Sequence, residues 1–411
     1  MFLDLSHDSL PRMLRSGVLV EPGTRRPRYW PVVWCAIYAG DLAESTLLGK
    51  LRAIETLYQH AEALYGLGSL DDAIGCLDHE MLAKVLESWF VSIRNKHESS
   101  SSDEIRWQTG LGFVTSIVKM LSGYQAQAVN LGKIEERLHR LNQLYRQLHI
   151  KKKTKSEIIR SLPESVGEAM YSSLDPLSLQ NPFSDPATRW RVFVAFILML
   201  HQGLRRGEML LLPVDCIKST YDKKLGRERY WLNVKNNEYE DEDTRYSKPS
   251  IKTASSIRQI PVSVTVANCV QVYVENYRGR PSHSFLLNSK RNMPLATESL
   301  TKAFAHVSST LPASVLSDLE NRTGKTSVTP HDLRHTCAVI RLHQLLNHGD
   351  SMDEALQKLR TFFGWAKNSV MPARYARAVF EDRLSSIWND TFDDRVALLR
   401  SIPKGSVPCK D

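Results

Sequence analysis

A chain of 411 residues is too long for one ordinary hydrophobic core, so its length predicts at least two domains. The net charge of +9 and the pI near 9.2 favour a polyanionic partner, although charge alone does not distinguish DNA, RNA and an anionic membrane. The longest apolar run, residues 192–200, is about half of a membrane span, and the start of the chain lacks a secretory signal, so we expect a soluble, cytoplasmic protein.

The first half of the chain has a helical pattern. Residues 1–44 are rich in proline and arginine and show no clear hydrophobic period. We interpret them as an N-terminal extension that either packs against the rest of the chain or extends freely from it. Residues 45–150 form a predicted helical domain. Within it we expect one helix that ends at Gly66, a short helix capped at Ser69, a helix beginning at Asp78, and helices over 107–121 and 134–148.

A basic linker is predicted over residues 151–164. It contains Lys151, Lys152, Lys153 and Lys155. A basic run between domains is often simply solvated, but it also suits contact with a phosphate backbone, and the sequence leaves both interpretations open.

The second half predicts a mixed domain over residues 165–395, followed by a tail over 396–411. Two short stretches, 229–235 and 258–262, alternate as strands do. Between them, the acidic run of residues 238–243 is interpreted as a solvated loop rather than a metal site, because consecutive acids point in different directions. We expect helices over 188–201, 264–278, 296–310, 331–348, 353–363 and 373–400.

Four basic segments in this half end in one isolated tyrosine. They are residues 203–208, 252–258, 331–335 and 363–377, and Tyr375 is the only tyrosine after His331. A phenol has a pKa near 10 and is a weak nucleophile toward an anionic phosphodiester. Fixed cations can stabilise the charge that accumulates on the phosphate oxygens, and the planar fork of arginine can grip two oxygens at once. The residue types therefore suit metal-free attack on a phosphodiester.

The strongest local signal is His331-Asp332-Leu333-Arg334-His335. Pro330 lies where it can begin a helix. His331, Arg334 and His335 then share one helix face through their spacings of three and four. A metal pair formed by the two histidines is the alternative, but no third ligand is evident.

In order and in local sequence, these segments resemble the tyrosine recombinases of the phage integrase family. The resemblance covers the second half of the chain with specific motifs and the first half in general pattern. It implies a mainly α fold with a small antiparallel sheet, in which a helical core-binding domain and a mixed α/β catalytic domain form a C-shaped clamp around duplex DNA.

The resemblance also implies a role for each motif residue. Arg205, in the pattern G-L-R-x-x-E, and Arg334 become the phosphate clamps, with Glu208 holding Arg205 and Arg206 as a rival for the same role. Lys252 becomes the hairpin lysine that protonates the leaving oxygen, with Lys248 as a rival. His331 becomes a phosphate donor and proton handler, and His335 a packing residue or an indirect support of the site.

The final motif contains Trp365 and Tyr375. Trp365 occupies the position where the family carries histidine or tryptophan. It either donates its indole N–H to a phosphate oxygen and packs against the helix of the tyrosine, or is an ordinary core aromatic. Tyr375 becomes the nucleophile. Its ten-residue spacing from Trp365 is one longer than is usual in the family, and we expect the extra residue in the loop before the tyrosine helix.

The implied activity is site-specific DNA recombination or integration through a 3′-phosphotyrosine, without cofactor, metal or ATP. The implied partners are double-stranded DNA, three further copies in a synaptic homo-tetramer formed from monomers or dimers, and accessory DNA-bending or directionality proteins. The expected localisation of the protein is the bacterial cytoplasm, in association with the nucleoid. A type IB topoisomerase, a metal-dependent phosphodiester hydrolase and a non-catalytic DNA-binding protein on the same fold remain alternatives.

Overall fold

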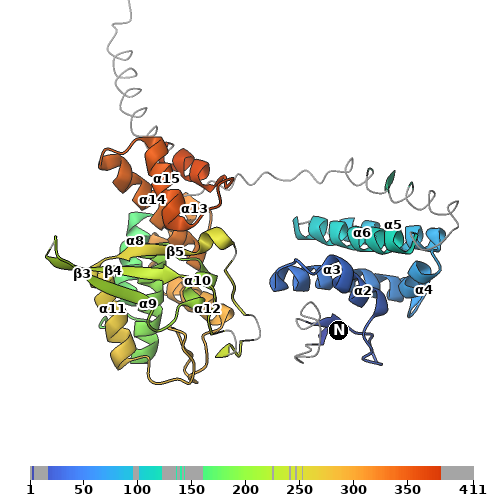
Figure 1. Cartoon of the computed structure of the whole chain (residues 1–411), viewed down its shortest axis with the longest axis horizontal. Helices are drawn as coiled ribbons and strands as arrows, with labels where there is room; N and C mark the ends of the chain where they lie inside the picture. The colour runs from blue at the N-terminus through green and yellow to red at the C-terminus, as the bar shows by residue number, and fades with distance from the viewer. Residues whose placement is uncertain are drawn as a thin grey trace, which may run out of the picture. The chain divides into compact units, whose positions relative to one another are not determined.

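The computed structural model describes residues 2–3, 17–95, 101–122, 136, 139–140, 143, 161–224, 226–239, 242–245, 248–251 and 253–380. The chain divides into two compact units, residues 1–156 and 157–411 (Figure 1). Several predicted features lie outside the described residues: Lys151, Lys152, Lys153, Lys155, Lys252, the tail over 396–411 and most of the helix expected over 134–148.

The first unit is helical around an aromatic core. Its elements are β1 (Phe2–Leu3), β2 (Val18–Leu19), α2 (Tyr29–Tyr38), α3 (Glu44–Tyr65), α4 (Ser69–Gly75), α5 (His79–Arg94) and α6 (Ser101–Ser122), and β1 pairs antiparallel with β2. Trp89 and Trp107 contact each other in the core with ring centroids 5.7 Å apart. Asp78 caps α5 as predicted, whereas the residue that caps α4 is Gly68 rather than Ser69.

The expected extension contributes to this core. Residues 29–38 form α2, and Trp30, Trp34 and Cys35 are buried in the same cluster as α3. The helix contains Pro31 and has apolar side chains around much of its circumference, so it lacks the one-sided pattern by which a surface helix is recognised. This segment of the extension therefore packs against the helical core of the first unit.

The second unit is mainly helical with one small sheet. Its elements are α8 (Glu164–Leu174), α9 (Pro186–Gln202), α10 (Arg206–Leu211), β3 (Ile217–Asp222), β4 (Arg227–Val234), η2 (Ala254–Ser256), β5 (Arg258–Val262), α11 (Val264–Asn276), α12 (Thr297–Ser309), α13 (Ala313–Thr323), α14 (Pro330–Asn347) and α15 (Met352–Phe363). The strands pair antiparallel in the order β3-β4-β5. The mainly α fold with a small antiparallel sheet is as predicted.

Helix α9 forms the centre of this unit. It begins at a side-chain cap by Asp185 with Pro186 in its first turn, and Phe196 and Leu198 are fully buried in the core. Both α11 and α14 pack against α9, and α15 contacts α14 and β5 (Figure 1). The end of α9 therefore meets the helix that carries the histidine motif.

The acidic run between the strands is not uniformly solvated. The Asp243 side chain is buried and forms an ion pair of 2.7 Å with Arg245, while the Glu242 carboxylate accepts a hydrogen bond of 2.6 Å from the Ser284 backbone N–H. The solvated-loop interpretation is therefore wrong for these two residues, which fix the β4–β5 connection to the core. No helix among the described residues is long and apolar enough to cross a membrane.

Candidate active site

The turn between α9 and α10 requires glycine at position 203. Gly203 has a φ of 59°, and a Cβ built on it would lie 2.3 Å from the Phe363 ring. Its carbonyl accepts a hydrogen bond from Nη1 of Arg334. The close approach of Phe363 and Arg334 therefore explains the glycine that precedes the first arginine motif.

Arg205 and Glu208 form a closed pair at the start of α10. Arg205 Nη1 donates to the Glu208 carboxylate at 2.5 Å and to the Ser256 hydroxyl at 3.0 Å. The Arg205 backbone N–H donates to the same carboxylate at 2.9 Å, so the Glu208 side chain caps the start of α10. Nε and Nη2 of Arg205 donate to no described residue, and the side chain is 25 % exposed. The arginine is thus oriented by Glu208 and keeps donors for another acceptor.

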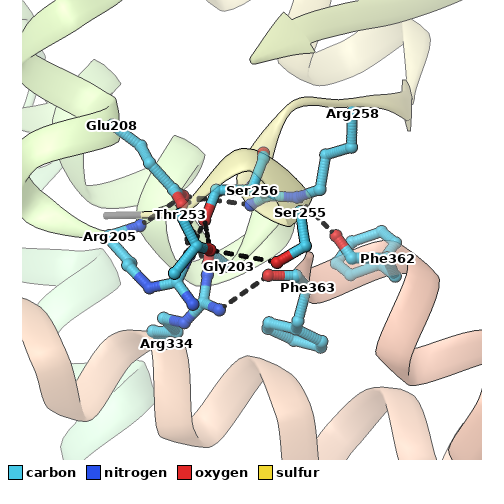
Figure 2. A network of polar contacts seen from close by, with 10 residues as sticks. All are labelled: Gly203, Arg205, Glu208, Thr253, Ser255, Ser256, Arg258, Arg334, Phe362 and Phe363. Carbon is cyan, nitrogen blue, oxygen red and sulfur yellow. Dashed lines mark hydrogen bonds and ion pairs between the residues drawn. The ribbon is translucent and has the colours of Figure 1, made fainter. Parts of the chain in front are cut away.

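A third arginine, Arg258, belongs to this cluster, although no role was predicted for it. Its Nη1 and Nη2 donate to the Glu208 carboxylate at 3.2 and 3.0 Å, and its Nε donates to the carbonyl of Phe362 at 2.7 Å (Figure 2). The side chain is almost fully buried. Arg258 begins β5 and so connects α10, the sheet and α15. The only signal for it was its place in the segment 252–258.

Arg334 approaches the same carboxylate from α14. Its Nη1 lies 3.7 Å from Glu208, its Nη2 donates to the Phe363 carbonyl at 2.9 Å, and its guanidinium lies 4.9 Å from the centre of the Phe363 ring (Figure 2). Burial and the neighbouring charge of Arg205 lower the pKa of Arg334 to about 9, although Glu208 opposes the shift.

Three guanidinium groups, those of Arg205, Arg258 and Arg334, therefore share one carboxylate. Burial disfavours ionisation of Glu208, but the hydrogen bond and charge of Arg258, with Arg334 and Arg205, outweigh it and lower the pKa of Glu208. Three positive charges against one negative charge leave an excess of two positive charges within this cluster. Such an excess is costly in a poorly solvated site unless an anion is bound.

The two histidines of the motif lie in different surroundings. His331 is exposed, and its ring contacts the ring of His335 edge-on, with centroids 4.2 Å apart. Partial desolvation and the charge of Arg334 lower the pKa of His331. His335 is half-buried, and its Nδ1 lies 2.6 Å from the Tyr375 hydroxyl. Burial and the neighbouring His331 lower the pKa of His335 to about 3.

Tyr375 lies in a stack of aromatic rings. Phe363, Trp365 and Tyr375 stack in that order, with centroids 4.9 and 5.2 Å apart and interplanar angles of 11° and 14°. Tyr375 is 1 % exposed, and burial raises its pKa above the ordinary phenol value while Arg334 and Arg205 oppose the rise. Packing of Trp365 against the helix of Tyr375 was predicted and is observed. The contact with His335, forty residues earlier in the sequence, was not predicted.

The segment between Trp365 and Tyr375 contains both a loop and a helix start. Gly364 caps the C-terminus of α15; its φ is 60°, and a Cβ built on it would lie 2.8 Å from the Ser255 carbonyl oxygen. Residues 364–370 are non-helical, and helix resumes at 371 with Pro372 in its first turn. This loop has room for the extra residue of the ten-residue spacing.

The two rival residues are surface side chains. Arg206 is exposed and donates to the Thr301 hydroxyl at 2.8 Å rather than to Glu208. Lys248 is exposed. Among the described residues, no group of three or more His, Cys, Asp or Glu side chains is placed to hold a metal ion.

The arginine cluster and Tyr375 lie in a segment of the chain that matches a protein-family model. Residues 180–382, which contain every motif residue from Arg205 to Tyr375, match the model of the phage integrase family. The chain therefore contains a phage integrase family domain. No relative was found among curated proteins.

The chain is also similar to solved recombinase structures. XerA recombinase is 13 % identical with a TM-score of 0.35, covering 87 % of this chain and 97 % of that one. XerH site-specific recombinase, bound to a palindromic difH substrate, is 12 % identical with a TM-score of 0.40 and coverages of 83 % and 95 %. Lambda integrase bound to DNA is 13 % identical with a TM-score of 0.41 and coverages of 83 % and 91 %. Because these TM-scores lie below 0.5, the family assignment rests on the phage integrase model alone.

Proposed function

We propose that this protein is a site-specific DNA recombinase that cleaves and rejoins strands through a 3′-phosphotyrosine on Tyr375. The observation that carries the proposal is the excess of guanidinium groups over carboxylates in the Arg205–Glu208–Arg258–Arg334 cluster. A phosphodiester anion supplies one of the two missing negative charges, and the charge that develops on its oxygens during attack strengthens the same contacts.

The proposed roles follow from what each side chain has available. Arg205 and Arg334 grip the scissile phosphate, because Glu208 and the carbonyls of Gly203 and Phe363 fix their orientation while Arg205 retains unused N–H groups. Arg258 remains the buried partner of Glu208. His331, exposed beside Arg334, donates to a phosphate oxygen, and Trp365 holds the ring of Tyr375 by stacking.

The reaction needs no net energy input. The Tyr375 oxygen forms a bond to phosphorus as the bond to the 5′ oxygen breaks, and Lys252 gives that oxygen a proton. A 5′ hydroxyl from a partner strand then attacks the phosphotyrosine and reverses the step. The phosphodiester energy is conserved in the covalent intermediate, so neither ATP nor metal enters the scheme.

The partners are part of the proposal. The net charge of +9 suits duplex DNA, and the lysines of the 151–164 linker add phosphate contacts. We further propose that residues 45–150 bind DNA together with the catalytic domain as a clamp, and that four protomers assemble on two duplexes.

A covalent-adduct assay in chelator tests this function. Nicked DNA fragments from around the protein's own gene are mixed with wild type, Tyr375→Phe and Tyr221→Phe, where Tyr221 is an exposed control in β3, and are then run under denaturing conditions. Adducts with wild type and Tyr221→Phe alone support the proposal. Adducts with all three identify another nucleophile. DNA binding without any adduct supports a non-catalytic binding protein, and relaxation of a supercoiled circle without strand exchange supports a topoisomerase.

A further inference from the structure

The Tyr375 hydroxyl has one hydrogen-bond partner among the described residues. That partner is Nδ1 of His335, at 2.6 Å. Tyr375 is 1 % exposed, and Trp365 covers one face of its ring. A phenol excluded from water in this way cannot pass its proton directly to solvent. The proton that leaves when Tyr375 attacks therefore needs an acceptor within the protein.

His335 is placed to be that acceptor by the helix that carries the phosphate clamp. It follows Arg334 directly on α14 and lies one turn after His331, whose ring it contacts edge-on. Lys325 and Asp332, which bond to each other, are the other charged groups that act on it besides Arg334. The hydrogen bond to the Tyr375 hydroxyl comes from His335 and not from His331. The exposed His331 therefore keeps the role of donor to the phosphate that is proposed above.

The protonation state of His335 suits an acceptor. Its lowered pKa keeps the imidazole neutral at neutral pH, so one ring nitrogen has a free lone pair. Because the phenol is a much weaker acid than the imidazolium, the proton stays on Tyr375 in the DNA-free protein. An arriving phosphate anion stabilises the imidazolium, and formation of the oxygen–phosphorus bond removes the charge from the phenol oxygen.

We propose that His335 is the general base that accepts the Tyr375 proton during strand cleavage, an inference that rests on the proposed recombinase function. In this step the O–H bond of Tyr375 breaks, its proton moves to Nδ1 of His335, and the phenol oxygen bonds to phosphorus. The 5′ oxygen leaves and takes a proton from the general acid proposed above. In rejoining, His335 returns its proton to the departing tyrosine.

The first test uses the full-length protein without DNA. Nitrogen-15 NMR of labelled histidine, assigned with His335→Asn, reports which ring nitrogen of His335 carries hydrogen between pH 5 and 8. We expect hydrogen on Nε2, and a changed Nδ1 resonance in Tyr375→Phe because its hydrogen bond is lost. Hydrogen on Nδ1 makes the imidazole the donor to Tyr375 and overturns the proposal independently of any DNA substrate.

The second test measures the rate of adduct formation in a single turnover. His335→Ala removes the ring, while His335→Asn keeps a polar atom near the position of Nδ1 but cannot accept a proton. We expect both variants to be about 10²–10⁴-fold slower than wild type, with His348→Ala at the end of the same helix unchanged. Added imidazoles should restore His335→Ala, and faster with increasing basicity of the imidazole.

The outcomes separate the proposal from its alternatives. A wild-type rate in His335→Asn reduces His335 to a positioning residue, and a faster rate in either variant makes the contact a restraint that holds Tyr375 back. Rescue that does not depend on the basicity of the imidazole also overturns proton transfer. If wild type forms no adduct on any fragment, the recombinase function fails and the catalytic role of His335 fails with it, while the tautomer result still describes the contact.

Discussion

Glu208 and Arg258 form a two-pronged ion pair across fifty residues of sequence, with Nη1 and Nη2 of Arg258 at 3.2 and 3.0 Å from the two carboxylate oxygens. The pair joins the first turn of α10 to the start of β5. Because Arg258 also donates to the carbonyl of Phe362, the same residue connects the sheet to the end of α15. The buried pair of Glu208 and Arg258 therefore supports Arg205 and Arg334, the two arginines expected to clamp phosphate.

Replacing Glu208 with glutamine should destabilise the protein more than it alters its shape. The change leaves Arg205, Arg258 and Arg334 without a shared counter-ion, and removal of one partner from a buried ion pair costs about 3–5 kcal/mol. Urea unfolding of Glu208→Gln measures the loss. Glu320→Gln, an exposed position on α13, should lie within about 0.5 kcal/mol of wild type. Equal stability of the two variants would show that the carboxylate charge is not required.

The contribution of Glu208 should disappear in acid. Its pKa is lowered in the folded protein, so its stabilisation is complete above the ordinary glutamate pKa near 4.3 and is lost as the pH falls through the lower folded value. The difference in unfolding free energy between wild type and Glu208→Gln should therefore be constant from about pH 7 to 5 and narrow below about pH 4. A difference that grows toward low pH would contradict the lowered pKa.

Gly203→Ala should disturb the clamp through packing rather than charge. The added Cβ lies 2.3 Å from the Phe363 ring at a residue whose φ is 59°, so Phe363 and the Arg334 contact must shift. We expect a loss of about 1–3 kcal/mol. Gly167→Ala is the matched control, because it lies inside α8 with nothing within 4 Å of the new Cβ and should stabilise by about 0.5–1 kcal/mol. Thermal unfolding of both variants measures the two changes in stability. Similar changes would show that the Phe363 ring moves to relieve the close contact.

Local sequence was sufficient where one element carries its own signal. Asp78 caps α5, Pro330 begins α14, and the second unit has the mainly helical fold with a small sheet that the pattern predicted. Strand β3 was missed because most of its side chains are exposed and it shows no apolar alternation; pairing with β4 defines it instead. Helix α2 was missed because its burial depends on α3 and α6.

The candidate site shows the same limit. The motif order indicated Arg205, Arg334 and Tyr375, and the structure brings Arg205 and Arg334 to one carboxylate. Neither the bond from Tyr375 to His335 nor the pair of Arg258 with Glu208 could be read from spacing. The partners are forty and fifty residues apart, so tertiary packing rather than local sequence brings them together.

A better leaving group on the DNA should restore the cleavage rate that is lost when Lys252 is replaced. Lys252→Ala should form adduct slowly on ordinary nicked DNA, because the departing 5′ oxygen then lacks its proton donor. The defect should largely vanish on DNA in which that oxygen is replaced by sulfur, since a thiolate leaves without protonation. Lys248→Ala, an exposed neighbour on the same connection, should cleave both substrates at the wild-type rate. Arg334→Ala should stay inactive on both, because sulfur replaces an acid and not a phosphate clamp. A Lys252→Ala defect that persists on the sulfur substrate assigns the acid elsewhere, with Lys248 and His331 next to be tested by the same comparison.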